Sequence, residues 1–136
     1  MSEATIEPEH IRWVNYACDC AERAMRLTNI NYKETEPAIK AARAWANNPT
    51  EENKVACQEA KATIDRVVYA TFANDRVAAH AAFAAAKAAE AAAVSTLDAA
   101  KYCATSAAEE VVDAVACIEE MWQTDRMTFY GLEVRP

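Results

Sequence analysis

Apolar residues recur every three or four positions along most of this chain, and this spacing predicts α-helices. Alanine, the strongest helix former, fills much of the pattern. We expect five helices, at residues 8–28, 35–46, 51–71, 75–93 and 97–125. Residues 126–136, which include the only glycine, are expected to form a non-helical arm lying over the bundle. The pattern therefore predicts a single all-α domain spanning residues 1–136, a compact alanine-rich bundle of about five helices.

Polar residues and prolines mark the expected helix boundaries. Pro49 ends the second helix because the residue before a proline avoids the helical region, and Thr50 is a strong N-cap for the third. Asn74 is expected to cap the fourth helix. No glycine or proline separates the fourth helix from the fifth, so one continuous helix is an alternative. We expect a break there, because the segment from Ser95 to Asp98 matches the pattern of a capping box.

The composition limits the kind of core that this bundle can build. The chain has 33 alanines, whereas Ile, Leu, Val, Phe, Met and Trp together number 29. A core made largely of methyl groups lets helices approach closely, and we expect Trp13, Trp45 and Trp122 to lie in it. Residues 77–93, which include twelve alanines, form either a tightly packed bundle helix or a smooth face that docks on a partner or a second copy.

Charge and cysteine content exclude several classes of function. A net charge of -7 argues against a protein that binds duplex DNA, RNA or an anionic membrane, because such proteins carry a basic face. No apolar stretch reaches the ~20 residues of a membrane span. The five cysteines are odd in number and irregularly spaced, unlike a disulfide framework. The first ten residues do not have the pattern of a signal peptide. We therefore expect a protein of the reducing cytoplasm.

The sequence contains no convincing catalytic or metal-binding motif. Cys18 and Cys20 would point ~200° apart on a helix, and His10 and His80 have no partner at helical spacing. His80 is expected to be a core histidine within an alanine run. The single Gly131 excludes a glycine-rich phosphate loop. We therefore predict a protein that is not an enzyme, with no metal and no cofactor.

The charge pattern near the C-terminus is the most informative feature. Between residues 109 and 125 there are six acids and no Lys or Arg. Such a run is either a solvated helix face or a surface that attracts a basic partner. The predicted partner-binding residues of this acidic face are Glu109, Glu110, Asp113, Glu119, Glu120 and Asp125. Trp13 and Tyr16, which share one flank of the first helix, form a second candidate, an aromatic anchor for a partner.

Two sequence blocks carry a family resemblance. Residues 16–24 read Tyr-Ala-Cys-Asp-Cys-Ala-Glu-Arg-Ala, and residues 36–46 read Glu-Pro-Ala-Ile-Lys-Ala-Ala-Arg-Ala-Trp-Ala. With the alanine-rich region that follows, residues 11–120 resemble the immunity proteins of bacterial polymorphic-toxin systems, which have relatives among bacteriophage accessory proteins. Those relatives tend to end in a basic helix, whereas this chain ends in an acidic one. The resemblance implies an all-α, non-catalytic protein that neutralises another protein by binding it.

Three hypotheses about function follow. The first is an immunity protein or a phage-borne inhibitor (anti-defence, anti-CRISPR-like) whose carboxylates occupy the nucleic-acid channel of a basic, nuclease-type effector. The second is an oligomeric sponge that sequesters a nucleotide signal through phosphate contacts from Arg12, Arg23, Arg43, Arg66 and Arg76. The third is a structural homo-oligomer held by the alanine face of the fourth helix. The first has a protein partner and binds neither nucleic acid directly nor a membrane.

Overall fold

The computed structural model describes residues 8–28, 34–71 and 76–130, apart from the side chains of 28, 69–71, 119–121 and 124–128. These residues form five α-helices and no strand, which confirms the predicted all-α bundle. The helices are α1 (Pro8–Thr28), α2 (Thr35–Asn47), α3 (Glu51–Thr71), α4 (Arg76–Ala93) and α5 (Leu97–Phe129).

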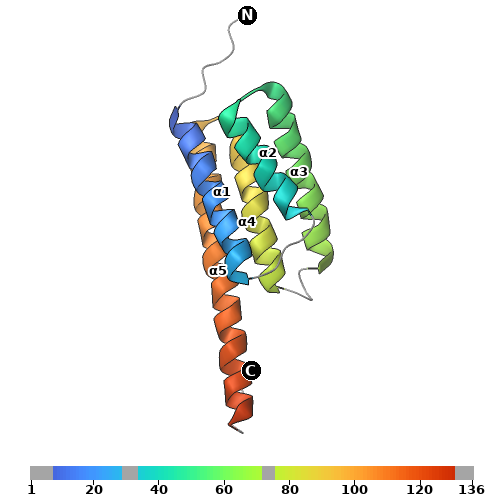
Figure 1. The fold of residues 1–136 in the computed structure, drawn as a ribbon, viewed down its shortest axis with the longest axis vertical. Coiled ribbons are helices and arrows are strands. Elements are labelled where there is room, and N and C mark those ends of the chain that lie inside the picture. Colours follow the sequence, from blue (N-terminus) through green and yellow to red (C-terminus); the bar gives the residue numbers. More distant parts are fainter. Residues whose placement is uncertain (1–7, 29–33, 72–75, 131–136) are drawn as a thin grey trace, which may run out of the picture.

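Helix α4 lies at the centre of the bundle, and α1, α2, α3 and α5 all pack against it (Figure 1). Twelve of its eighteen residues are buried, and eleven of those are alanines. Their small side chains let four neighbours approach one helix at close range. Of the two alternatives for residues 77–93, the tightly packed bundle helix is therefore the one observed, because the other helices already cover its alanines.

Hydroxyl side chains cap two of the helices. The backbone N–H of Asn53 donates to Oγ1 of Thr50 at 3.1 Å, which confirms Thr50 as the N-cap of α3. The predicted break between α4 and α5 is also confirmed. Its cap is Thr96, whose Oγ1 accepts the N–H of Ala99 at 3.1 Å, one residue later than the capping pattern from Ser95 predicted. The expected cap Asn74 lies outside the described residues.

Two polar side chains connect α1 to the rest of the bundle. The buried His10 donates from Nε2 to the carbonyl oxygen of Ala91 at 2.8 Å, and its ring lies 4.8 Å from that of Trp45. Arg43 of α2 donates to the carboxylates of Asp19 and Glu22 on α1. Because the core is mostly methyl groups, these contacts add the directional interactions that fix how α1 lies on α2 and α4.

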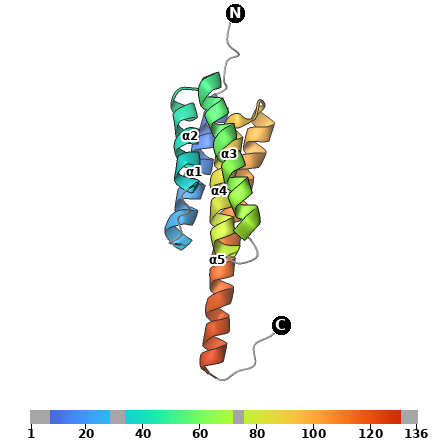
Figure 2. The same cartoon turned by 90° about the vertical axis from the view of Figure 1, so that its right-hand side faces the viewer.

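Helix α5 continues well beyond the ends of the other four helices in both views (Figures 1 and 2). Cys117 is the last of its described residues to be buried. We call residues 118–130 the α5 extension. Residues 126–129, expected to begin the arm, are still helical, and residues 131–136 lie outside the described part of the chain.

The position of Trp122 follows from the length of α5. We expected this residue in the core, but its side chain lies on the α5 extension and is 54% exposed. The prediction failed because the apolar stripe of α5 runs past the point where its neighbours end. Trp45, by contrast, is buried as expected, and Trp13 is half-buried against the core.

Candidate functional site

An exposed apolar stripe runs along the distal half of α5. Val115, Ile118, Trp122 and Phe129 are all exposed, and their spacings of three, four and seven residues place them on one helix face. The stripe continues the line of Val111, which is packed into the bundle core. The same face of α5 is thus buried inside the bundle and left open beyond it.

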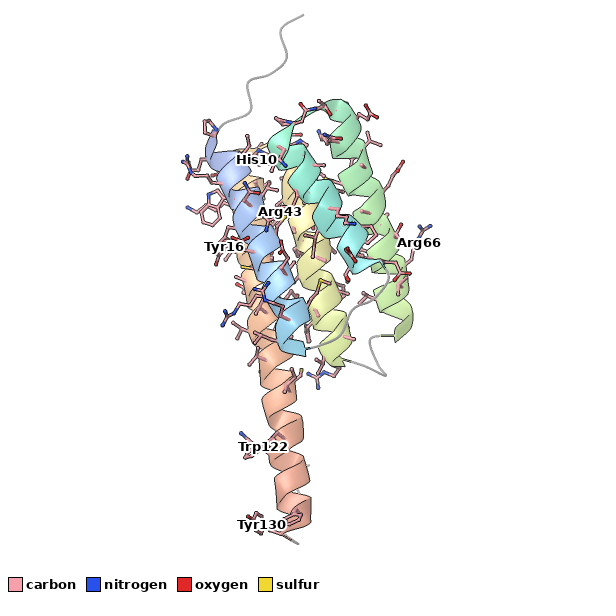
Figure 3. All side chains as sticks on the ribbon, viewed as in Figure 1. His10, Tyr16, Arg43, Arg66, Trp122 and Tyr130 are labelled. Carbon is pink, nitrogen blue, oxygen red and sulfur yellow. The ribbon has the colours of Figure 1, made fainter. Side chains whose placement is uncertain are left out.

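The tip of the α5 extension adds aromatic surface to this stripe. Phe129 and Tyr130 meet edge to face with their ring centres 5.3 Å apart, and both are largely exposed. Figure 3 shows Trp122 and Tyr130 on the part of α5 that lies clear of the bundle. A helix face of this kind, in a chain that has so few large apolar residues to form its core, is typical of an interaction surface.

Two residues of the predicted acidic face, Glu109 and Asp113, lie on the side of α5 opposite the apolar stripe. Glu109 and Asp113 are exposed and lie about half a turn from the apolar stripe at 100° per residue. Glu120 follows at the same helical spacing in the sequence. The side chains of Glu119, Glu120 and Asp125 are outside the described residues, so their place on this face remains a prediction.

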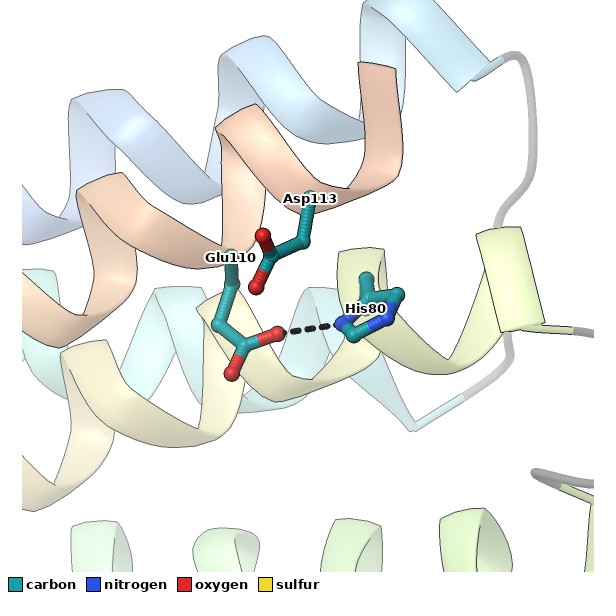
Figure 4. Close-up of side chains that lie close together, drawn as sticks. All are labelled: His80, Glu110 and Asp113. Carbon is teal, nitrogen blue, oxygen red and sulfur yellow. Dashed lines mark hydrogen bonds and ion pairs between the residues drawn. The ribbon is translucent and has the colours of Figure 1, made fainter. Parts of the chain in front are cut away.

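Glu110 is less exposed than Glu109 and Asp113. Its carboxylate oxygen lies 2.6 Å from Nδ1 of His80 on α4, and the two side chains are only 21% and 14% exposed (Figure 4). Asp113 approaches the same pair from the next turn of α5. Glu110 therefore faces the bundle and is not part of the open acidic surface. The sequence missed this cluster because residues 80 and 110 have no local spacing that reveals their contact.

The predicted aromatic anchor on α1 is a separate surface. Trp13 and Tyr16 meet edge to face at 5.7 Å, and Lys101 places its Nζ 5.7 Å from the centre of a Trp13 ring. Trp13 and Tyr16, together with Glu9 and Arg12, line a shallow open depression. Tyr16 is exposed, as such an anchor requires. Figure 3 shows that Tyr16 lies on the bundle, far along the molecule from Trp122.

The cysteines behave as small apolar side chains. All five are free thiols, and only Cys20 is not buried. Burial raises the pKa of Cys18 to about 12, and it raises the pKa of Cys57 and that of Cys103 to about 11. These three thiols are therefore protonated near neutral pH, whereas nucleophilic and metal-binding cysteines act as thiolates.

The arginines proposed for phosphate contacts are divided among different environments. Arg43 is held between α1 and α2 by two carboxylates and by Asn15, whose Oδ1 it approaches at 3.1 Å. Burial alone would lower the pKa of Arg43, but the hydrogen bonds to the carboxylates outweigh this effect and raise it. Arg66 projects away from α3 on the opposite side of the bundle (Figure 3). These two side chains therefore serve no common pocket.

Comparison with family models, with curated proteins and with solved structures gives no match for this chain. None of the helices, in the part of the chain that the structure describes, combines the length and apolar character needed to cross a membrane.

Proposed function

We propose that this chain is a non-enzymatic protein that acts by binding another protein through the α5 extension. The single observation that supports this is the exposed apolar stripe of Val115, Ile118, Trp122 and Phe129 on a helix that leaves the bundle. Exposed aromatic residues at helical spacing are the anchors with which a helix enters a partner's groove. The bundle holds the base of α5, so the extension is presented at low entropic cost.

The charge around the stripe selects the kind of partner. Residues 109–125 carry six acids and no Lys or Arg, within a chain of net charge -7. Two copies of the extension would repel each other, whereas a basic protein would be attracted and would associate faster. A basic partner is therefore favoured over self-association through the extension. The alanine face of α4 is covered by the bundle and takes no part in this contact.

A basic partner fits the function that the family resemblance implies. The resemblance implies an immunity protein, or a phage-borne inhibitor of a defence effector, that neutralises a nuclease-type protein. In this proposal the aromatic stripe docks against the effector, and carboxylates on the opposite side of α5, those of Glu109 and Asp113 among them, take the place of nucleic-acid phosphates near its basic channel. The expected setting is the cytoplasm, where such effectors and their nucleic-acid substrates meet.

The test compares retention of proteins by the immobilised chain and two aromatic variants. Lysate of the native host is passed over wild type, Trp122→Ala and Tyr102→Ala, and the eluates are compared by mass spectrometry. Tyr102 is a matched control, since it is also on α5 and is 70% exposed, but within the bundle. We expect wild type and Tyr102→Ala to retain one basic protein. Trp122→Ala should retain at most about a tenth as much of that protein, as expected for the loss of an interface anchor.

Salt and charge reversal test the electrostatic part of the proposal. Washing in ~0.5 M salt, or the double change Glu109→Lys and Glu120→Lys, is expected to weaken retention of the same protein. Equal retention by wild type and Trp122→Ala contradicts the proposed surface. A nucleotide retained by the chain without any protein partner favours the sponge hypothesis instead.

A further inference from the structure

Three potential metal ligands meet where α4 and α5 pack together. His80, Glu110 and Asp113 each offer a ligand atom, and these atoms lie within 4.8 Å of one another (Figure 4). Among the described residues this is the one such group of three or more His, Cys, Asp or Glu side chains. The group was not expected from the sequence, in which Glu110 and Asp113 follow His80 by thirty and thirty-three residues.

The helices hold these ligands in a fixed arrangement that is open on one side. Glu110 and Asp113 are three residues apart, so both project from one side of α5. His80 faces them from α4 and is largely buried, whereas Asp113 is exposed. An ion can therefore enter from the side of Asp113, and water can complete its coordination shell.

We propose that His80, Glu110 and Asp113 bind a divalent transition-metal ion between α4 and α5. One imidazole nitrogen with two carboxylate oxygens suits Zn²⁺, Co²⁺, Fe²⁺ or Mn²⁺, whereas Ca²⁺ and Mg²⁺ favour oxygen ligands alone. The two carboxylates neutralise the charge of the ion. His80 coordinates as neutral imidazole through Nδ1.

The observed geometry requires only a small adjustment to accept an ion. Nδ1 of His80 and the nearer oxygen of Glu110 are 2.6 Å apart. Two ligand atoms that each lie about 2.1 Å from one ion are about 3.0–3.4 Å apart. The three ligand atoms, which lie within 4.8 Å of one another, reach this separation by rotation of their side chains. His80 and Glu110 alone form an ion pair, and Asp113 adds the third ligand that a metal site requires.

Titration of the whole chain with Co²⁺ tests this site directly. Visible absorption reports nitrogen and oxygen ligation, and a near-ultraviolet sulfur-to-cobalt band would report thiolates instead. We expect one Co²⁺ per chain, visible bands without the sulfur band, and a higher melting temperature with the ion bound. Removing one ligand with Asp113→Asn should weaken binding at least about tenfold, since the loss of an outer-shell partner alone has an effect of this size.

A control on the same helix separates ligation from general negative charge. Glu109 is exposed but is not part of the cluster, so Glu109→Gln should bind Co²⁺ as wild type does. Circular dichroism verifies that both variants are folded. The proposal is overturned if the titration shows no saturation, if the sulfur band accompanies binding, or if Asp113→Asn and wild type bind equally. The experiment uses no protein partner, so its outcome is independent of the proposed function.

Discussion

At the scale of single residues, a few polar side chains add directional contacts to a core that is mostly alanine. His10 reaches a backbone carbonyl at the end of α4 and contacts the ring of Trp45 on α2. Arg43 bridges α2 to two carboxylates of α1. Glu22, Arg43 and Trp45 thus take part in the contacts that join α1, α2 and α4. These three side chains therefore serve the fold of this protein.

The buried thiols predict a loss of stability at alkaline pH. The pKa of Cys18 is about 12 in the folded chain against an ordinary value of 9.0, so the folded state keeps a proton that the unfolded state loses. The stability that the protonated Cys18 thiol contributes is fully present below about pH 9 and is lost as the pH rises toward the folded-state pKa. At about pH 10.5 the loss from this thiol should reach about 2 kcal/mol of unfolding free energy.

Urea unfolding in reducing buffer at about pH 8 and about pH 10.5 measures this effect. Lysines and tyrosines also titrate in this range, so the comparison is with Cys18→Ala, which keeps every other group. The variant should lose less stability than wild type between the two pH values. An equal loss in both proteins would show that the Cys18 thiol is not the group responsible.

At the scale of helices, capping residues set where α3 and α5 begin, and neighbouring helices set which face of each helix is buried. The caps at Thr50 and Thr96 are local hydrogen bonds, so the sequence predicted these boundaries to within a residue. The burial of α4 depends on four other helices, and the exposure of the distal part of α5 depends on where those helices end. Helical periodicity predicts an apolar face but does not contain this information.

The break between α4 and α5 provides a test of the cap. Thr96→Ala removes the acceptor of the Ala99 N–H and should lower the unfolding free energy by about 1 kcal/mol. Ser95→Ala, at the neighbouring exposed position, should change it by less than about 0.5 kcal/mol. Both values come from denaturant unfolding. A larger cost for Ser95→Ala would place the start of α5 one residue earlier.

At the scale of the whole molecule, a compact bundle holds one helix so that its distal half stands clear. The sequence supplied the fold class, the helices and the acidic run, because these depend on local pattern and composition. It did not supply the contact of His80 with Glu110 and Asp113, which are brought together only when α4 and α5 pack. It also placed Trp122 in the core, because the apolar stripe is the same in the buried and exposed halves of α5.

The central claim, that the α5 extension contacts a basic partner protein, is tested most directly by photo-crosslinking. A benzophenone amino acid replaces Trp122 in one version of the chain and Tyr102 in the other, and each is irradiated in the native host. We expect a crosslink from position 122 to one basic protein and none to that protein from position 102. Equal crosslinking from both positions, or crosslinking from position 122 only to a second copy of this chain, would contradict it.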